Sequence, residues 1–401
     1  MADLLGVISI SFVCFITLLL IKKKPEVSNI IFVALFVRIL VMFFGYYFIV
    51  LPDSNFDALG FEKGAWERSQ EELFDIISYP KNSNFIKSII AIPYSIFGRS
   101  LLMAQSISLC FGIASVYLGW LLAKKLWDEK TAKKCGWILA LFPSLILYSV
   151  LTLREIYACF FLLVALHGVV NWCKDKSFKS LVLAILGFVG GTIFHGAIIV
   201  GAFVFAVFVV FNSFKELTKL LSTYRINFKD SFIILSAIIF LIFYFTNQIF
   251  IPKLGTFEDS INTGRLLDEM GFRLKGDAAY PYWMKMETPF EIIYKGLVRI
   301  IYLLFSPFPW DVKEPVHLIG MFDGLLYLVI VYFILRNIKT LWKDPILKLI
   351  LIILICYFFV FGVGVSNFGA GTRHRSKFVV ELIILAAPFI PRFTFFKKNK
   401  V

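Results

Sequence analysis

Charged residues are scarce in this chain of 401 residues: they make up 17% of it, whereas 59% of it is hydrophobic. The mean hydropathy is +0.82. The apolar residues come in blocks of roughly twenty, the length of helix that crosses a ~30 Å hydrocarbon core. The scarcity of charge therefore excludes an ordinary soluble domain and predicts an all-α polytopic membrane protein.

Cysteine is also rare, and its placement excludes further classes of protein. The six cysteines fall within apolar blocks or at their ends, and none lies in a long polar loop: Cys14, Cys110, Cys135, Cys159, Cys173 and Cys356. This placement argues against a disulfide framework and against a cysteine-based metal site. The acidic residues Asp53, Asp57 and Glu62 have no known metal-ligand spacing either. We therefore expect no metal and no cofactor.

Acidic residues are too few to balance the basic ones. The chain has 41 Lys and Arg against 27 Asp and Glu, a net charge of +14. The basic residues gather in alternate short connections: Lys22–Lys24, Lys124–Lys134, Lys174–Lys179, Lys215–Lys229, Arg336–Lys343 and Arg392–Lys400. This distribution is the positive-inside pattern, so these connections are predicted to be cytoplasmic and to contact anionic lipid. The expected partner is the bilayer, and no nucleic acid is expected.

About eleven membrane-spanning helices follow from this topology, with the N-terminus outside and the C-terminus inside. The block Leu4–Ile21 is interpreted as a retained helix because its basic cluster follows the apolar run. The segment Glu291–Phe305 is short and carries two basic residues, so we expect an interfacial or re-entrant helix. The predicted spans are 4–21, 29–51, 101–121, 135–152, 156–172, 180–194, 196–212, 231–250, 318–335, 345–364 and 377–391.

The chain divides into four segments on this prediction. An extra N-terminal helix with its basic turn occupies 1–28, and a membrane core occupies 29–250 with a large outer loop at 52–100. A second outer segment with the interfacial helix occupies 251–317. The last helices and a basic tail occupy 318–401. We find no internal repeat, which argues against a transporter built from two related halves.

The polar residues that do not anchor the chain collect on the outer side. The first outer loop carries Asp53, Asp57, Glu62 and Arg99. Tight outer turns carry further groups: Arg154 and Glu155 in "TLRE", His195 in "IFHGA", and Arg373, His374 and Arg375 in "GAGTRHRSK". Chemistry at the outer boundary between membrane and water is therefore predicted.

Several of these stretches resemble the GT-C superfamily of polytopic glycosyltransferases. The first part of the resemblance is an outer-loop helix ending "YSIFG", an apolar span ending "AKKLW", and then "ALFPSLILYSVLTLRE". "GAGTRHRSKFVVELIILAAP" is similar to the opening of the last span in many members, and "SPFPW" resembles a further piece of the bacterial, protein mannosyltransferase-like members. The resemblance covers about two thirds of the chain as a pattern of order and topology.

This resemblance implies a donor, a reaction and roles for particular residues. Members transfer a sugar from a polyprenyl-phosphate donor to an acceptor hydroxyl on a glycan, a lipid or a protein. An aspartate in the first outer loop acts as the general base, a position held here by Asp53 and Asp57. Arg373 and Arg375, followed by Arg154, are the candidates for binding the donor phosphate, because arginine can donate two parallel bonds. The remaining substrate-binding candidates are Glu155, His195 and His374.

The sequence leaves open whether Asp53 and Asp57 lie on one face of a helix and which of them is the base. Residues four apart share one face of a helix, but Pro52 and the "DSN" composition favour a turn first. We favour Asp53 as the base. Each candidate also has a structural interpretation: Asp53 as a solvated turn residue, Arg154 and Glu155 as the closure of a helical hairpin, His195 as a helix-end cap, and the 373–375 cluster as a headgroup anchor.

Other functions are also compatible with the pattern. One is a polymerase that joins polyprenyl-diphosphate-linked repeat units with arginine clamps; another is a transporter or flippase of such lipids. Arg38 inside the second span and His167 inside an apolar helix are interpreted as structural. The Lys-, Ile- and Phe-rich composition is typical of an AT-rich bacterial genome, so we expect a bacterial plasma membrane with the active face extracytoplasmic.

Overall fold

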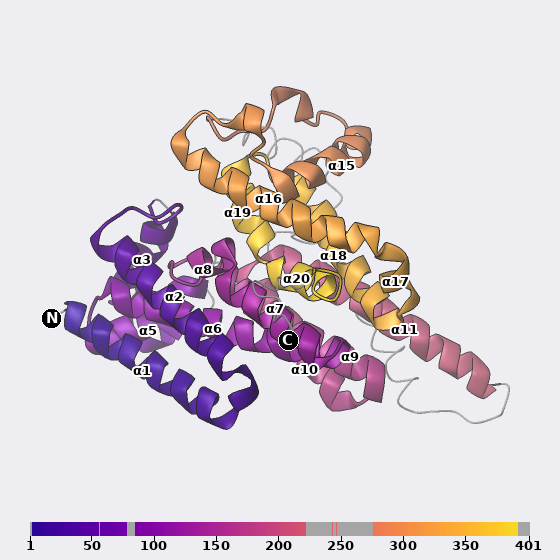
Figure 1. Ribbon diagram of the computed structural model, residues 1–401, viewed down its shortest axis with the longest axis horizontal. Helices are drawn as coiled ribbons and strands as arrows, with labels where there is room; N and C mark the ends of the chain where they lie inside the picture. The colour runs from indigo at the N-terminus through magenta and orange to yellow at the C-terminus, as the bar shows by residue number, and fades with distance from the viewer. Residues whose placement is uncertain are drawn as a thin grey trace, which may run out of the picture.

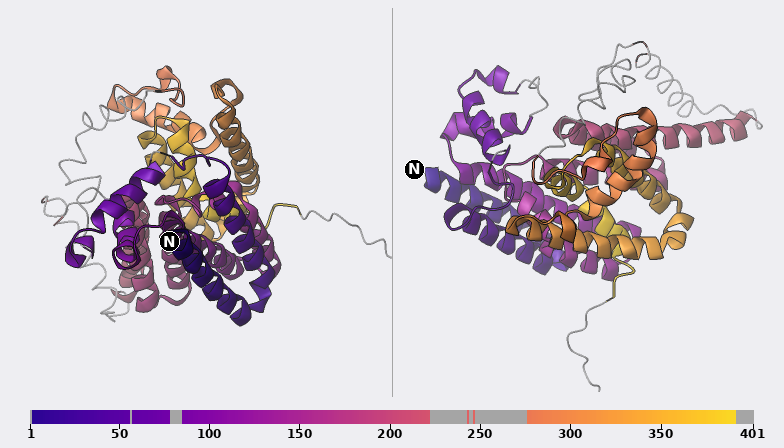
Figure 2. Two further views of the ribbon diagram at one scale, coloured as in Figure 1. Left: turned by 90° about the vertical axis from the view of Figure 1, so that its left-hand side faces the viewer. Right: turned by 90° about the horizontal axis from the view of Figure 1, so that it is seen from above.

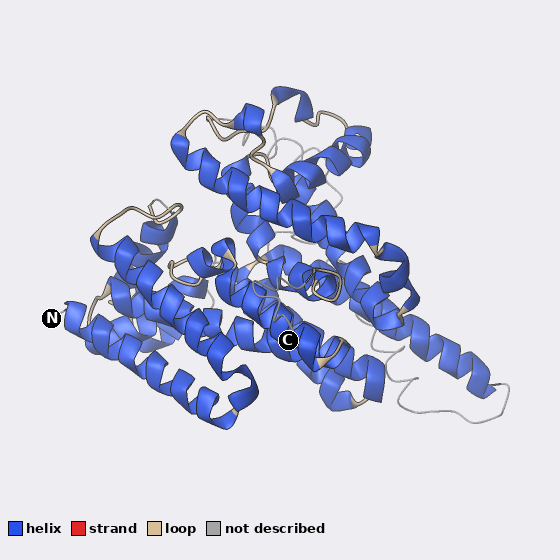
Figure 3. Cartoon of the chain, viewed as in Figure 1, coloured by secondary structure: helices blue, strands red, loops and turns tan. Residues whose placement is uncertain are grey.

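Helices make up all of the regular secondary structure that the computed structural model describes, apart from one isolated bridge between Ala279 and Asn367. The description covers residues 2–55, 57–77, 85–221 and 276–391, together with residues 243 and 246. Figure 3 shows helices joined by short connections across these ranges. The predicted all-α class is confirmed.

Seven apolar stretches in the described residues are long enough to cross a membrane. This finding supports a multi-pass membrane protein. The helices that contain them are α1 (Ala2–Lys23), α2 (Ser28–Tyr47, preceded by the short helix η1, Pro25–Val27), α6 (Leu101–Leu126), α9 (Glu155–Asp175), α11 (Ile199–Leu221, preceded by η2, Gly196–Ile198), α16 (Pro315–Arg336) and α18 (Pro345–Gly364).

The remaining four predicted spans differ from this description. The predicted span 180–194 corresponds to α10 (Phe178–Phe194), an apolar helix of 17 residues. The span 377–391 corresponds to α20 (Val379–Ala386), which has only eight residues. The span 135–152 is divided into α7 (Glu129–Leu141) and α8 (Pro143–Tyr148). The span 231–250 lies outside the described residues, apart from positions 243 and 246, so the total of eleven remains a prediction.

Pro143 causes the division between α7 and α8, and Arg38 donates hydrogen bonds to carbonyls that the division leaves without helical partners. Proline has no N–H, so the carbonyl of Leu139 loses its normal helical partner. The fully buried Arg38 of α2 supplies one: Nη2 donates to Leu139 O at 3.3 Å, and Nη1 donates to Ala140 O at 2.9 Å. The structure therefore agrees with a structural interpretation of Arg38.

The helices α9 and α10 approach each other through paired small residues. A Cβ atom added to Gly168 would lie 2.2 Å from the backbone nitrogen of Ala184, and one added to Gly187 would lie 2.2 Å from that of Ala165. Small residues at such crossings allow close backbone packing, which is the main source of helix association inside a membrane. His167 lies beside this crossing, where its Nε2 is 3.0 Å from Leu118 O.

One end of the bundle collects basic side chains. Lys124 at the end of α6 pairs with Glu26 between α1 and α2, and Lys174 at the end of α9 donates to Lys125 O at 2.8 Å. In Figure 1 and in both views of Figure 2, α1 and α2 lie side by side, and both helices pack against α6. The turn between α1 and α2 and the end of α6 therefore lie at the same end of the bundle. Connections that the charge pattern predicts to be cytoplasmic thus lie together at this end, and the side of the membrane remains a prediction.

The opposite end carries short helices that the sequence prediction treated as outer loops. The first outer loop contains α3 (Asp57–Arg68), α4 (Leu73–Ile77) and α5 (Phe85–Phe97). Glu62 of α3 joins α3 to α5, since it accepts from Arg99 Nε and Nη2 at 2.9 and 2.7 Å and from the Tyr94 hydroxyl at 2.8 Å. Glu62 thus stabilises the outer loop.

The C-terminal half contributes its own elements to the end that carries α3 to α5, which is the predicted outer end. They are η3 (Tyr282–Met284), α15 (Pro289–Phe305), η4 (Pro309–Asp311) and α19 (Phe368–Ser376), while α17 (Ile338–Lys343) lies at the other end. The helix α15 agrees with the short helix predicted at 291–305. Its Arg299 is fully buried and donates to Val363 O at 3.0 Å and to Ser366 Oγ at 2.8 Å, so it holds α15 against the end of α18.

Candidate active site

The connection from α2 to α3 is a tight turn that places Asp53. Residues 52–55 form the turn, and the Ser54 hydroxyl donates to Leu51 O at 2.6 Å. Asp53 has a φ of 60°, in the left-handed region, which aspartate adopts more readily than most residues. Asp57 then begins α3, where a negative charge is favourable. The turn predicted from Pro52 and "DSN" is confirmed.

The carboxylate of Asp53 is held by a tyrosine from the next part of the core. Tyr148, the last residue of α8, donates its hydroxyl to Asp53 Oδ2 at 2.7 Å. Burial raises the pKa of Asp53 above its ordinary value, while the Tyr148 hydrogen bond and the charge of Arg373 limit the rise. A partly desolvated carboxylate of this kind is a stronger proton acceptor than a solvated one.

Four side chains form a charged cluster beside Asp53: Asp57, Glu155, Arg373 and Lys377. Arg373 of α19 pairs with Asp57, and its Nη2 lies 3.5 Å from Glu155 Oε1. Lys377, which follows α19, lies 3.3 Å from the same Glu155 oxygen. Arg373 also interacts electrostatically with Asp53. The cluster brings together the outer loop, the start of α9 and α19.

Exposure falls steadily from one side of the charged cluster to the other. The side chain of Asp57 is 60% exposed and that of Arg373 is 15% exposed, whereas those of Glu155 and Lys377 are 1% and 0% exposed. The cluster therefore has a mouth at Asp57 and a floor at Glu155 and Lys377. A ligand entering at Asp57 would meet Arg373 before it reached the floor.

Some polar atoms around the cluster have no hydrogen-bond partner among the described residues. They include the Nε atoms of Arg373 and Arg154 and the Oε2 atom of Glu155. A buried donor without a partner costs free energy, and in a native structure it often marks the position of a ligand or a water. Arg154 lies with its guanidinium 5.7 Å from the Phe61 ring, and its charge acts on Glu155 and Lys377.

The two predicted histidines meet beside the floor of the cluster. Their ring centroids are 5.1 Å apart, and the Lys377 ammonium lies 2.7 Å from His374 Nδ1. Because an ammonium only donates, His374 Nδ1 accepts this bond. His195 ends α10 and packs its ring 4.8 Å from that of Phe361. His374 is thus linked to the cluster, and His195 lies behind it.

Arg375 is separated from this group although it lies two residues from Arg373. Its side chain is fully buried, and each of its five N–H donors has an acceptor in the protein. Nε and Nη2 donate to Asp323 Oδ2 at 3.0 and 2.7 Å, and the other donors reach the carbonyls of Leu304, Ser306 and Gly320. This geometry leaves no donor for a phosphate and favours a structural role.

No metal centre appears in the part of the chain that the structure describes. Nowhere in it do three His, Cys, Asp or Glu side chains come together as ligands for an ion. The carboxylates of the charged cluster face cations of the protein instead.

Sequence reasoning did not identify three residues that the structure links to the site or to its arginines. Lys377 lies in the stretch "GAGTRHRSK" and Tyr148 lies in the predicted span 135–152, but no local pattern indicates that either residue belongs to the site. Asp323 was also missed, although an acidic residue inside an apolar span is a known sign of a specific partner. That signal could have indicated that one arginine of the 373–375 pair is already neutralised.

Comparison with known proteins adds nothing to this geometry. No family model, no curated protein and no solved structure matches the chain. The resemblance to the GT-C superfamily therefore stays a prediction.

Proposed function

We propose that the protein is a membrane glycosyltransferase that moves a sugar from a polyprenyl-phosphate donor to an acceptor hydroxyl at the outer face. The observation that carries the proposal is the position of Asp53: its carboxylate is oriented by Tyr148 and lies at the edge of a cluster whose arginine points toward the same mouth. A proton acceptor and a phosphate-binding cation are thus held side by side.

The reaction begins when Asp53 accepts the proton of the acceptor hydroxyl. The acceptor oxygen attacks the anomeric carbon as the bond from that carbon to the phosphate oxygen breaks. Polyprenyl phosphate leaves with the electron pair of that bond and gains negative charge. Arg373 stabilises this charge with Arg154, and the interaction strengthens as the charge develops.

Exposed aromatic side chains at the same end of the bundle support a lipid-linked donor. The outer end carries exposed aromatic side chains typical of the headgroup level: Tyr282, Trp283 and Trp310 are 73%, 58% and 71% exposed. A donor anchored by its own lipid tail would present its phosphate at this depth. Holding base and donor at one depth supplies proximity, which is a large part of the barrier reduction.

The competing polymerase has less support than the transferase. A diphosphate carrier calls for more cationic donors than a monophosphate carrier does, and Arg375 donates all of its hydrogen bonds to the protein. Arg373 and Arg154 therefore have to act without it. A single phosphate matches this smaller set of cations better.

The donor class is tested with the purified full-length protein in lipid nanodiscs. It is incubated with a panel of polyprenyl-phosphate sugars and polyprenyl-diphosphate oligosaccharides, and released carrier is measured by mass spectrometry. Release of monophosphate carrier, together with a new glycosidic bond, is the expected result. Release of diphosphate carrier alone would point to the polymerase, and no release from any donor by folded protein would point to a transporter.

A further inference from the structure

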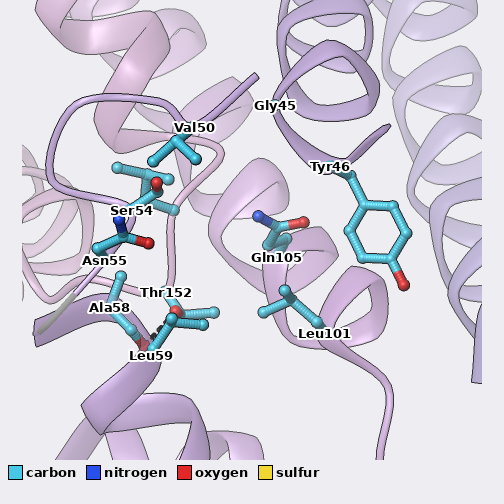
Figure 4. Close-up of a pocket in the computed structure, with 11 residues that line it drawn as sticks. Gly45, Tyr46, Val50, Ser54, Asn55, Ala58, Leu59, Leu101, Gln105 and Thr152 are labelled. Atoms are coloured by element: carbon cyan, nitrogen blue, oxygen red, sulfur yellow. Dashed lines mark hydrogen bonds between the residues drawn. The ribbon is translucent and has the colours of Figure 1, made fainter. Parts of the chain in front are cut away.

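A second feature of this end of the molecule is a cavity of about 190 Å³ lined in part by Ser54 and Asn55, the residues that follow Asp53. Its wall comes from the end of α2, the turn at Ser54 and Asn55, the start of α3, the first turns of α6, and Leu151 with Thr152. In Figure 4, Gln105 lies between the Ser54–Asn55 turn and Tyr46. We call this cavity the neutral pocket.

Two residues that line the neutral pocket belong to the same chain segments as residues of the candidate active site. Ser54 directly follows Asp53, and Thr152 lies in the connection between Tyr148 and Arg154. Thr152 is almost fully buried and donates its hydroxyl to Ala58 O at 2.7 Å, so it joins this connection to α3. A group bound in the pocket would therefore lie next to the proposed base.

The polar side chains of the pocket are uncharged, and they offer hydroxyl and amide acceptors together with the amide donors of Gln105 and Asn55. The hydroxyls of Ser54 and Thr152 donate to the carbonyls of Leu51 and Ala58. The lone pairs of the two hydroxyl oxygens can therefore still accept hydrogen bonds from a ligand. Gln105 is 7% exposed, and its Oε1 has no hydrogen-bond partner among the described residues. None of the described residues that line the pocket has a cationic side chain, so its lining disfavours phosphate and favours a neutral group that carries several hydroxyls.

The size of the pocket limits its ligand further. Its volume equals the share of about six water molecules in the liquid, well below the ~300 Å³ at which pockets for drug-sized ligands begin. One small ring fits this volume better than an oligosaccharide does.

We propose that the neutral pocket binds a single uncharged sugar ring, the terminal ring of the acceptor, through hydrogen bonds from its hydroxyls to Gln105, Ser54 and Thr152. This inference rests on the proposed function, since it places the acceptor ring beside the turn that carries the proposed base Asp53. The ring is supplied either by a lipid-linked glycan or by a soluble sugar.

Binding is tested on the full chain in nanodiscs by saturation-transfer NMR with methyl β-glucoside, methyl N-acetyl-β-glucosaminide and the anionic methyl β-glucuronide. The two neutral glycosides are expected to bind and the glucuronide is not. Gln105→Leu should weaken their binding about fivefold, the loss expected for one hydrogen bond. The exposed Gln70→Leu on the turn after α3 is the matched control and should bind as the wild type does.

Ser54→Ala provides a second variant in case Gln105→Leu does not fold, and it should weaken binding to a similar extent. Octyl β-glucoside below its micelle concentration distinguishes a lipid-linked source, because an attached chain should then tighten binding. Failure of every glycoside to bind, with both variants as stable as the wild type, would show a cavity that holds water only and would overturn the proposal. Equal binding of the glucuronide would also overturn it.

The result for the pocket can be separated from the result for the proposed function. Glycoside binding that depends on Gln105, without carrier release from any donor, would support the sugar site and reject the transferase. Carrier release that depends on Asp53, with a Gln105→Leu variant unchanged in glycoside binding and in the KM for acceptor, would keep the transferase and reject the pocket.

Discussion

Arg373 and Arg375 lie on the same helix two residues apart, yet they occupy opposite environments. Arg373 faces the mouth of the charged cluster, where its partners are the carboxylates of Asp57 and Glu155 and its Nε has no partner among the described residues. Arg375 faces the interior, where Asp323 and three carbonyls occupy all of its donors. The two regions use the same side chain for different purposes.

Helix geometry explains why the two arginines part. With 3.6 residues per turn, two positions along an α-helix are separated by about 200°, so their side chains leave on opposite faces. The motif "RHR" therefore directs one arginine toward Asp57 and Glu155 and the other toward Asp323 of α16. Availability of donors, rather than the presence of a basic cluster, decides which arginine can bind a phosphate.

Removing Arg375 should have the largest effect on stability. Arg375→Met leaves the carboxylate of Asp323 buried without its cation, which should cost about 3–5 kcal/mol of unfolding free energy. The double variant Arg375→Met/Asp323→Leu removes both charges and should recover much of that loss. Denaturant unfolding in mild detergent measures both. A stable Arg375→Met protein with weakened donor binding would contradict the structural role.

Removing Arg373 should affect kinetics more than stability. Arg373→Gln loses charge-assisted hydrogen bonds of about 1.5–3 kcal/mol to the leaving phosphate, so carrier release should slow about 10- to 100-fold. Arg373→Lys keeps the charge but loses the planar fork of two parallel donors, so its rate of carrier release should lie between those of the wild type and Arg373→Gln. Single-turnover kinetics measures this chemical step separately from substrate binding and product release. Unchanged release in Arg373→Gln would remove the distinction between the two arginines.

Tyr148→Phe should have a smaller effect that appears in the pH profile. The Tyr148 hydrogen bond lowers the pKa of Asp53, so its loss should raise that pKa further. The acid limb of kcat/KM should move to higher pH, and activity near neutral pH should change by about fivefold, as expected for one hydrogen bond. An acid limb that stays in place would mean that Asp53 is not the titrating base.

Asp53→Asn should bring a modest gain in stability. Because burial raises the folded pKa of Asp53, its charge costs stability fully above the folded pKa, and this cost disappears below the unfolded pKa of about 3.9. Asparagine accepts the same Tyr148 bond and tolerates the left-handed turn. The variant should therefore unfold at a higher temperature at neutral pH, and the difference should vanish in acid. Lower stability at neutral pH would contradict this sign.

The sequence predicts much of the outer surface of this site but little of its interior. The turn at Asp53 follows from proline and "DSN", and the basic end follows from charge alone. The burial of Arg375 depends on how α16 packs against α19, and no local pattern encodes that contact. The break at Pro143 was also missed, because a proline in an apolar run reveals a missing N–H but not the arginine that replaces it. Tyr148 and the neutral pocket similarly depend on packing between segments far apart in the chain.

The most direct test of the central claim is the rate of carrier release by Asp53→Asn, measured beside Asp57→Asn and the exposed control Asp277→Asn in folded protein. Loss of a general base should slow Asp53→Asn about 10²- to 10⁴-fold. Asp57→Asn should slow release less, since it removes one partner of Arg373 at the mouth, and Asp277→Asn should match the wild type. An Asp53→Asn protein that releases carrier at the wild-type rate would show that Asp53 is not the base and would contradict the account.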